Sequence, residues 1–253
     1  MRFFVINKKQ LLFGILATLV IAAVCIGSGN AVMTFLVGGR EIPIYSVERN
    51  DNRVALTFDC AWSDDDVDDI IKTLKSHECG ATFFVTGKWA EQYQGTVNKL
   101  YREGFEIGSH SYNHDDYTKM SASEIEADME KCDKAITKAT GYKSVLCRAP
   151  SGAYNDTVVR TIEGSGRYCI QWSVDGIDYT ETTAEEIYSR IAGKTQAGDI
   201  ILLHCGTEHT AEALVYILDT LSEKYDIVSV SELIYKDNYV IDGNGRQSQR
   251  EIF

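Results

Sequence analysis

Acidic, basic and imidazole side chains follow apolar, strand-like runs at several separate places in this chain. They are Asp59, His110, His114, Arg148, Asp175 and His204. Two imidazoles separated by three residues suit Zn2+ or another divalent transition ion. A bound metal polarises a carbonyl and acidifies water, while a carboxylate takes a proton and another imidazole protonates a leaving amine. This set of residue types is suited to amide hydrolysis.

Each of these residues also has a structural interpretation. Asp59 could cap the helix that follows it, and His110 and His114 could be polar loop residues. Arg148 could pair with a surface acid, and His204 could be a core histidine beside an apolar strand. The functional interpretation is stronger if all of them share one edge of a fold, because unrelated structural roles would not collect them there.

From residue 53 onward, apolar runs rich in strand formers alternate with polar stretches of helical periodicity. Strands are predicted over residues 54–58, 81–85, 105–108, 145–147, 169–174, 200–203 and 227–230. Helices are predicted over residues 64–76, 89–103, 122–140, 155–164, 184–194 and 210–224. Such alternation gives a parallel sheet covered by helices, with its chemistry at the carboxyl ends of the strands.

The predicted fold class is therefore α/β, and the sheet is either an open doubly wound one or a closed barrel. The sequence has no G-x-G-x-x-G after its first strand and no Walker A motif, so nucleotide binding loses its usual support. We predict a distorted (β/α) barrel of about seven parallel strands, preceded by an N-terminal transmembrane helix.

The first 29 residues have the pattern of a membrane anchor. Arg2, Lys8 and Lys9 precede an apolar run over residues 11–26, and no charge follows until Arg40. About 18 to 20 apolar residues span a bilayer, and preceding basic residues stay in the cytoplasm. We predict contact with the lipid bilayer through residues 11–28 and an extracytoplasmic body. A cleaved signal peptide is the alternative, and it would make the protein secreted.

The rest of the chain divides into a connecting segment over residues 30–52, a catalytic domain over 53–236 and a polar C-terminal tail over 237–253. The formal net charge of -12 disfavours nucleic acid as a partner. Seven cysteines are dispersed without a C-x-x-C pair, so their spacing shows no disulfide framework. Most are expected to be small, buried, apolar residues.

Five motifs follow one another in a recognisable order. They are Thr57-Phe58-Asp59-Cys60, His110-Ser111-Tyr112-Asn113-His114, Arg148-Ala149-Pro150-Ser151-Gly152, Asp175-Gly176-Ile177-Asp178-Tyr179 and Leu202-Leu203-His204. Together they resemble the NodB-homology polysaccharide deacetylases, carbohydrate esterase family 4, over about residues 53–236. Residues 40–45 and 172–175 are similar to the PdaB-type branch, which is associated with sporulation.

The resemblance implies a role for each site residue. Asp59 matches the general base, oriented by Arg148, and His204 matches the general acid, tuned by Asp175. His110 and His114 match metal ligands. The implied substrate-binding residues are Trp62, Ser151 through its backbone N–H, Tyr179 and Leu202.

Two positions depart from the family's motifs. Cys60 stands where the family has a metal-binding acid. A thiolate binds Zn2+ well, so Cys60 could complete a Cys-His-His site, or it could be a buried residue that leaves only two histidines. Tyr179 stands where a tryptophan is usual, which keeps a ring in the pocket and adds a hydroxyl.

We predict metal-assisted hydrolysis of N-acetyl groups from an amino sugar polymer of the cell envelope. Peptidoglycan is the first candidate substrate, and Zn2+ is the expected cofactor. The alternative is a catalytically weak or inactive module with a glycan-binding or structural role, which Cys60 favours. A metal-dependent amidohydrolase of small cyclic amides shares the fold, but a membrane anchor favours a polymeric substrate.

Overall fold

The computed structural model describes residues 40–250, and these residues are built around one curled parallel sheet. Its strands follow the order β6-β5-β4-β3-β2-β8-β7, and β9 pairs with the start of β2. The strands are β2 (Arg53–Cys60), β3 (Thr82–Val85), β4 (Glu106–Ser109), β5 (Leu146–Cys147), β6 (Tyr168–Cys169), β7 (Val174–Asp175), β8 (Ile200–His204) and β9 (Asp226–Val228). The α/β class and the parallel sheet are confirmed.

The central strand is β2, which is long and almost entirely buried. Its residues alternate between two faces of the sheet, as extended backbone requires. Phe58 and Cys60 pack into the core beneath the helices, whereas Thr57 and Asp59 point to the inner face of the curl. Asp59 is level with His204 on β8, so two side chains from distant parts of the sequence emerge together.

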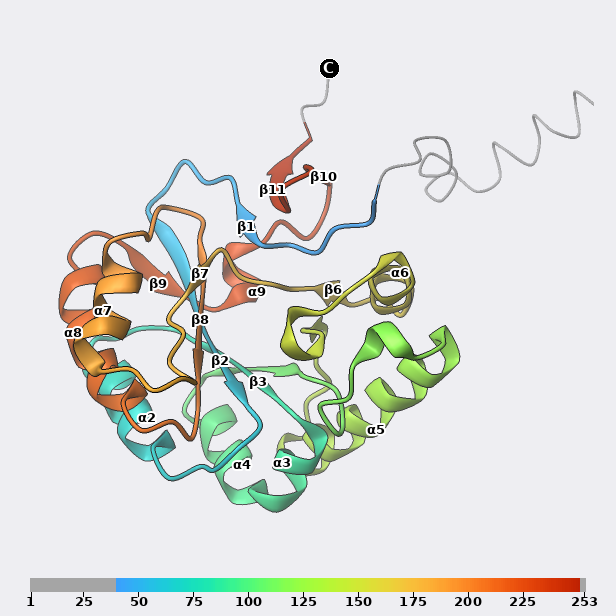
Figure 1. Cartoon of the computed structure of the whole chain (residues 1–253), viewed down its shortest axis with the longest axis horizontal. Helices are drawn as coiled ribbons and strands as arrows, with labels where there is room; N and C mark the ends of the chain where they lie inside the picture. The colour runs from blue at the N-terminus through green and yellow to red at the C-terminus, as the bar shows by residue number, and fades with distance from the viewer. Residues whose placement is uncertain (1–39, 251–253) are drawn as a thin grey trace, which may run out of the picture. The chain divides into compact units, whose positions relative to one another are not determined.

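Helices form an arc over the outer face of the sheet (Figure 1). They are α2 (Val67–Ser76), α3 (Gly87–Gln92), α4 (Gln94–Arg102), α5 (Ala122–Thr140), α6 (Asp156–Gly164), α7 (Ala184–Ala192) and α8 (Thr210–Leu221). The short α9 (Val230–Leu233) lies inside this arc and packs with Ala55 and Phe84. The ends of α5 show why its limits were predictable. Ser121 and Glu124 form a capping box at its start, and Gly141 closes it with a φ of 75°.

The sheet is open, with β6 and β7 at its two edges. The expectation of one strand over residues 169–174 is therefore corrected. That segment forms two short strands at opposite edges, β6 beside β5 and β7 beside β8. Within residues 40–250 no pairing joins β6 to β7. Residues 170–173 cross between the two edges instead, and Ile44 bridges to Ile170 while the Val47 N–H donates to the Gly198 carbonyl. Residues 44–47 therefore help to fill the gap between the two open edges of the sheet.

The segments on either side of the predicted domain also belong to the folded unit. Strands β1 (Ser46–Val47), β11 (Arg246–Gln249) and β10 (Tyr239–Ile241) form a second, three-stranded sheet. Gln247 is fully buried and exchanges two hydrogen bonds of 2.8 Å with the backbone of Tyr235. The predicted bounds are therefore corrected. Residues 41–52 of the predicted connecting segment (30–52) and residues 239–249 of the predicted polar tail (237–253) belong to the folded unit.

The predicted membrane segment over residues 11–28 lies outside the described residues. Among residues 40–250, no helix has the length and apolar character needed to span a bilayer.

Candidate active site

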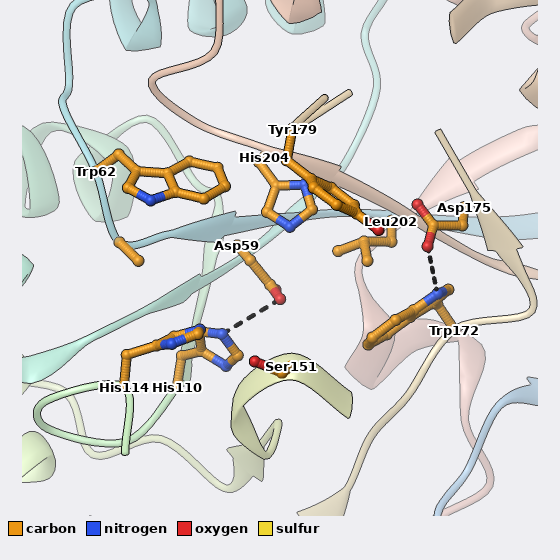
Figure 2. Close-up of a pocket in the computed structure, with 11 residues that line it drawn as sticks. Asp59, Trp62, His110, His114, Ser151, Trp172, Asp175, Tyr179, Leu202 and His204 are labelled. Atoms are coloured by element: carbon orange, nitrogen blue, oxygen red, sulfur yellow. Dashed lines mark hydrogen bonds and ion pairs between the residues drawn. The ribbon is translucent and has the colours of Figure 1, made fainter. Parts of the chain in front are cut away.

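A cavity of about 240 Å3 opens at the carboxyl ends of the parallel strands. Its lining residues are Asp59, Ala61, Trp62, His110, His114, Ser151, Trp172, Asp175, Tyr179, Leu202 and His204. Figure 2 shows the Asp59 carboxylate between the His110–His114 pair and the His204 ring. The structure thus brings together nearly every predicted site residue; Arg148 supports the floor of the cavity, and Cys60 is the one that points elsewhere.

Asp59 is held by a buried arginine at the floor of the cavity. Arg148 has no exposed surface, and its Nη1 donates to Asp59 Oδ1 at 2.7 Å and to Thr57 Oγ1 at 2.9 Å. Burial opposes ionisation of Asp59, but the Arg148 guanidinium, with His110 and His204, holds its pKa below the ordinary value. Asp59 is therefore a carboxylate of fixed orientation, as the role of general base requires.

His110 and His114 stand side by side on the loop that follows β4. Their rings pack edge to face with centroids 5.0 Å apart. His110 Nδ1 lies 2.9 Å from the Arg148 carbonyl, an acceptor, so this nitrogen carries the proton and Nε2 is left free toward Asp59 Oδ2 at 3.4 Å. Burial lowers the pKa of His110 to about 4, against the opposing effect of Asp59. A neutral imidazole with a free nitrogen is the form that binds metal.

The loop between these histidines is a tight turn in which two non-glycine residues adopt positive φ. Ser111 has a φ of 64° and His114 a φ of 62°, a region that most side chains avoid. The Ser111 hydroxyl accepts from the His114 N–H at 2.7 Å, and Asp128 of α5 accepts from the Tyr112 N–H at 2.8 Å. These bonds offset the backbone cost and fix both rings toward the cavity.

Cys60 does not complete a metal site with these histidines. Its side chain leaves the strand on the helix-facing side, where its sulfur lies 2.7 Å from the sulfur of Cys205. Burial raises the pKa of the Cys60 thiol, so the thiolate that would bind Zn2+ is disfavoured. Within residues 40–250, no three His, Cys, Asp or Glu side chains are arranged to hold a metal. The prediction of Cys60 as a ligand is wrong, and the residues present do not fit a site with three protein ligands.

His204 stands on the opposite wall, at the end of β8. Its Nδ1 donates to Asp178 Oδ1 at 2.7 Å, which directs Nε2 into the cavity. Asp178 is itself fixed, because its Oδ2 accepts from the His204 N–H at 2.7 Å and from the Thr210 hydroxyl at 2.5 Å. Burial disfavours the imidazolium, but Asp178 outweighs it and raises the pKa of His204. The raised pKa favours the protonated form of His204, which can donate a proton.

The hydrogen-bond partner of His204 is Asp178, whereas Asp175, which was predicted to tune His204, raises its pKa only by a smaller electrostatic effect. Asp175 lines the cavity but accepts from Trp172 Nε1 at 3.2 Å and from the Ile177 N–H at 2.8 Å. Trp172, whose ring forms part of the wall, and Asp178 were both missed as site residues. A signal for Asp178 existed, since it lies directly before Tyr179 in the same motif.

Apolar and aromatic side chains form the remaining walls. Leu202 is almost fully buried beneath the cavity, whereas Trp62 and Tyr179 are about half exposed at its mouth, 50% and 51%. Their rings lie 5.3 Å and 5.1 Å from the His204 ring, one on each side. Ser151 faces them with a φ of 56° at the turn after β5. This shape fits a ligand in which a small apolar group is attached to a flat polar group.

The comparisons with known proteins agree with this geometry. A family model described as polysaccharide deacetylase matches residues 46–169. The chain is 34% identical to the peptidoglycan-N-acetylglucosamine deacetylase PgdA of Listeria monocytogenes over 200 residues, which cover 79% of this chain and 42% of that protein. The solved structure of the peptidoglycan deacetylase PdaC from Bacillus subtilis superposes with a TM-score of 0.68 at 30% identity, covering 74% of this chain and 92% of that one. The chain belongs to the polysaccharide deacetylase family.

The enzymes of this family are hydrolases that act on amide bonds. The chain is also similar to a mutant of a CE4 family pseudoenzyme with restored enzymatic activity, with a TM-score of 0.73 and 32% identity, covering 77% of this chain and 71% of that one. The wild-type form of that pseudoenzyme comes from Bacillus anthracis. The chain spans 60%, 42% and 40% of the length of three of the curated relatives that it matches.

Proposed function

We propose that this chain removes N-acetyl groups from an amino sugar polymer of the cell envelope, with peptidoglycan as the first candidate. One observation carries the proposal. A carboxylate whose pKa is lowered, Asp59, and an imidazole whose pKa is raised, His204, stand at the ends of adjacent strands and face one cavity, each held by its own buried partner. A base and an acid placed on two sides of a bound amide are what hydrolysis needs.

The residues divide the reaction between them. Asp59 takes a proton from the attacking water, and Arg148 keeps its carboxylate aimed at that water. His204 gives its proton to the nitrogen as the carbon–nitrogen bond breaks, so the amine leaves as a neutral group. The Ser151 N–H, which the family resemblance matches to an oxyanion donor, would stabilise the tetrahedral oxyanion.

The aromatic rings at the mouth of the cavity support a sugar as substrate. Trp62 and Tyr179 expose their faces on either side of His204, and Leu202 forms an apolar wall where a methyl group can be buried. Two of the relatives are named for deacetylation of peptidoglycan. Amino sugars of that polymer carry the N-acetyl group that this cavity would bind.

The test is acetate release by the purified full chain in detergent, on peptidoglycan and on N-acetylglucosamine oligomers, with and without added Zn2+. We expect Asp59→Asn and His204→Gln each to reduce release by about 100-fold or more, since general acid–base catalysis contributes about 10^2 to 10^4. His77→Gln is the matched control, because His77 contacts Asp219 on the surface away from the cavity. No acetate from any substrate at any Zn2+ level refutes the enzymatic proposal.

A second function is favoured by one specific observation. Cys60 pairs with Cys205 instead of facing His110 and His114, and a pseudoenzyme is among the similar structures. A chain that binds glycan without turning it over would keep the aromatic mouth and need no metal. Calorimetric binding of N-acetylglucosamine oligomers that is weakened by Trp62→Ala, together with no acetate release, would identify this function.

We also propose that the chain is anchored in the membrane with its folded unit outside the cytoplasm. The support is the basic Arg2, Lys8 and Lys9 before an uncharged apolar run. A PdaB-type role in sporulation is proposed on the similarity of residues 40–45 and 172–175 alone. Digestion of the folded unit by protease added outside intact protoplasts supports the orientation, and its protection until lysis refutes it.

A further inference from the structure

Two cysteines meet on the face of the sheet opposite the cavity. The sulfurs of Cys60 and Cys205 are 2.7 Å apart, and neither residue has exposed surface. Ordinary non-bonded contacts between heavy atoms are about 3.5 to 4.0 Å, whereas a disulfide bond is about 2.05 Å long. The two thiols are thus closer than simple packing requires.

The backbone supports a covalent link at this place. Asp59 pairs with His204 in the parallel register of β2 and β8, and the Cys205 N–H donates to the Asp59 carbonyl at 3.0 Å. Cys60 directly follows Asp59, and Cys205 directly follows His204. Neighbouring strands lie about 4.8 Å apart, and a disulfide accepts Cα separations of about 4.4 to 6.8 Å. The strand spacing therefore falls within the disulfide range, and the bond requires the sulfurs to approach from 2.7 Å to about 2.05 Å.

We propose that Cys60 and Cys205 form a disulfide that ties β2 to β8 directly behind Asp59 and His204. The oxidant is a small-molecule or protein disulfide. The two thiols lose two protons and two electrons, one sulfur–sulfur bond forms between them, and the oxidant's disulfide is released as two thiols.

The surroundings indicate when the link forms. Burial raises the pKa of both thiols in the folded chain, which leaves little thiolate for exchange. No oxidant reaches either sulfur once the helices cover this face. The bond forms during folding, while β2 and β8 come together, and afterwards it is shielded from reductants. It is a permanent cross-link and not a switch.

The cross-link also bears on the cavity. Cys60 occupies the position at which the family's motif has a metal-binding acid, and a disulfide leaves it no thiol with which to bind metal. Cys60 and Cys205 instead join the two strands that carry the base and the acid, one residue beyond each. The proposal is independent of the deacetylase activity, because a binding module would contain the same link.

The test is a map of cysteine connectivity in the full chain. The chain is reduced and unfolded, refolded in detergent with oxidised glutathione, and its folded fraction is isolated by gel filtration. Denaturation in N-ethylmaleimide and digestion should give one linked peptide pair containing Cys60 and Cys205. Alkylation of both cysteines, or a link from either one to another cysteine, overturns the proposal.

A matched control comes from Cys147 and Cys169. They also pair in register on adjacent parallel strands, β5 and β6, but among residues 40–250 no hydrogen bond joins their sulfurs. Cys147→Ala should leave the Cys60–Cys205 link intact. Reductant present during refolding should lower the melting temperature of the wild type and of this variant by about 5 to 15 °C. It should leave the Cys60→Ala/Cys205→Ala double variant unchanged, and an equal loss in that variant refutes a stabilising link.

Discussion

Arg148→Met is the perturbation that tests how the base is held. Arg148 is fully buried and donates to Asp59 at 2.7 Å, to Thr57 at 2.9 Å and to the Gln171 carbonyl at 3.1 Å. Its guanidinium carbon also lies 4.1 Å from the centre of the Phe84 ring. Methionine fills much of the same space but supplies no charge and no donor, so the Asp59 carboxylate is left buried without its main partner.

The magnitude follows from that burial. Removing one partner of a buried ion pair costs about 3 to 5 kcal/mol, because the remaining charge is uncompensated. For a domain of about 150 to 250 residues, each kcal/mol lowers the melting temperature by about 2 to 4 °C. We therefore expect Arg148→Met to melt roughly 6 to 20 °C below the wild type at neutral pH. Circular dichroism at 222 nm measures this shift directly.

A second substitution separates the charge from the packing. Asp59→Asn in the Arg148→Met background removes the unpaired carboxylate, so the double variant should melt above Arg148→Met alone. The sign of the pH effect follows from the pKa of Asp59, which the fold lowers. The pair's stabilisation is fully present above the unfolded pKa of about 3.9 and is lost as pH falls through the lower folded value. The gap between the wild type and Arg148→Met should narrow in acid. A loss below about 1 kcal/mol at neutral pH would refute the reasoning.

Three further predictions concern the cavity and the end of β2 behind it. Asp178→Asn removes the carboxylate that raises the pKa of His204 most, while burial persists. The alkaline limb of the pH profile of acetate release should therefore move to lower pH, and an unmoved limb contradicts the assignment. Trp62→Ala should raise KM by about 2- to 12-fold with little change in kcat, since aromatic contacts contribute about 0.5 to 1.5 kcal/mol; a change in kcat alone contradicts a stacking role. Cys60→Asp should tighten Zn2+ binding in calorimetry by at least about tenfold, provided that the strand end turns inward; unchanged affinity shows that the carboxylate stays on the helix side.

The parts of the fold that were predicted are those with a long repeat. Helix α5 runs for about five turns between a capping box and a left-handed glycine, and β2 is a buried run that contains several strand formers. The segment over residues 169–174 was not predictable in the same way. Its apolar residues are buried on two different edges of the sheet, and local pattern does not record that the chain crosses between them.

The site was predictable where a side chain comes directly after a strand. Asp59, His110 and His204 lie at the ends of β2, β4 and β8, and parallel strands bring their carboxyl ends to one edge. The partner of His204 was not predictable by this route. Asp175 and Asp178 lie in an irregular loop, and only the turn at Ile177, with a φ of 54°, decides which carboxylate returns to the imidazole.

The end of β2 decides which parts of the family's chemistry this chain retains. Strand alternation means that Asp59 and Cys60 cannot share a face while the strand continues, and it does continue, because Cys60 still pairs with Val85 of β3. An acid at position 60 would reach the cavity only if the strand ended one residue earlier. With cysteine at position 60, the extended backbone buries the side chain against Cys205. A neutral thiol is buried there without the desolvation cost of a carboxylate. The acid–base pair and the metal site are therefore separable in this fold: Asp59 and His204 keep their geometry whether or not His110 and His114 find a third ligand.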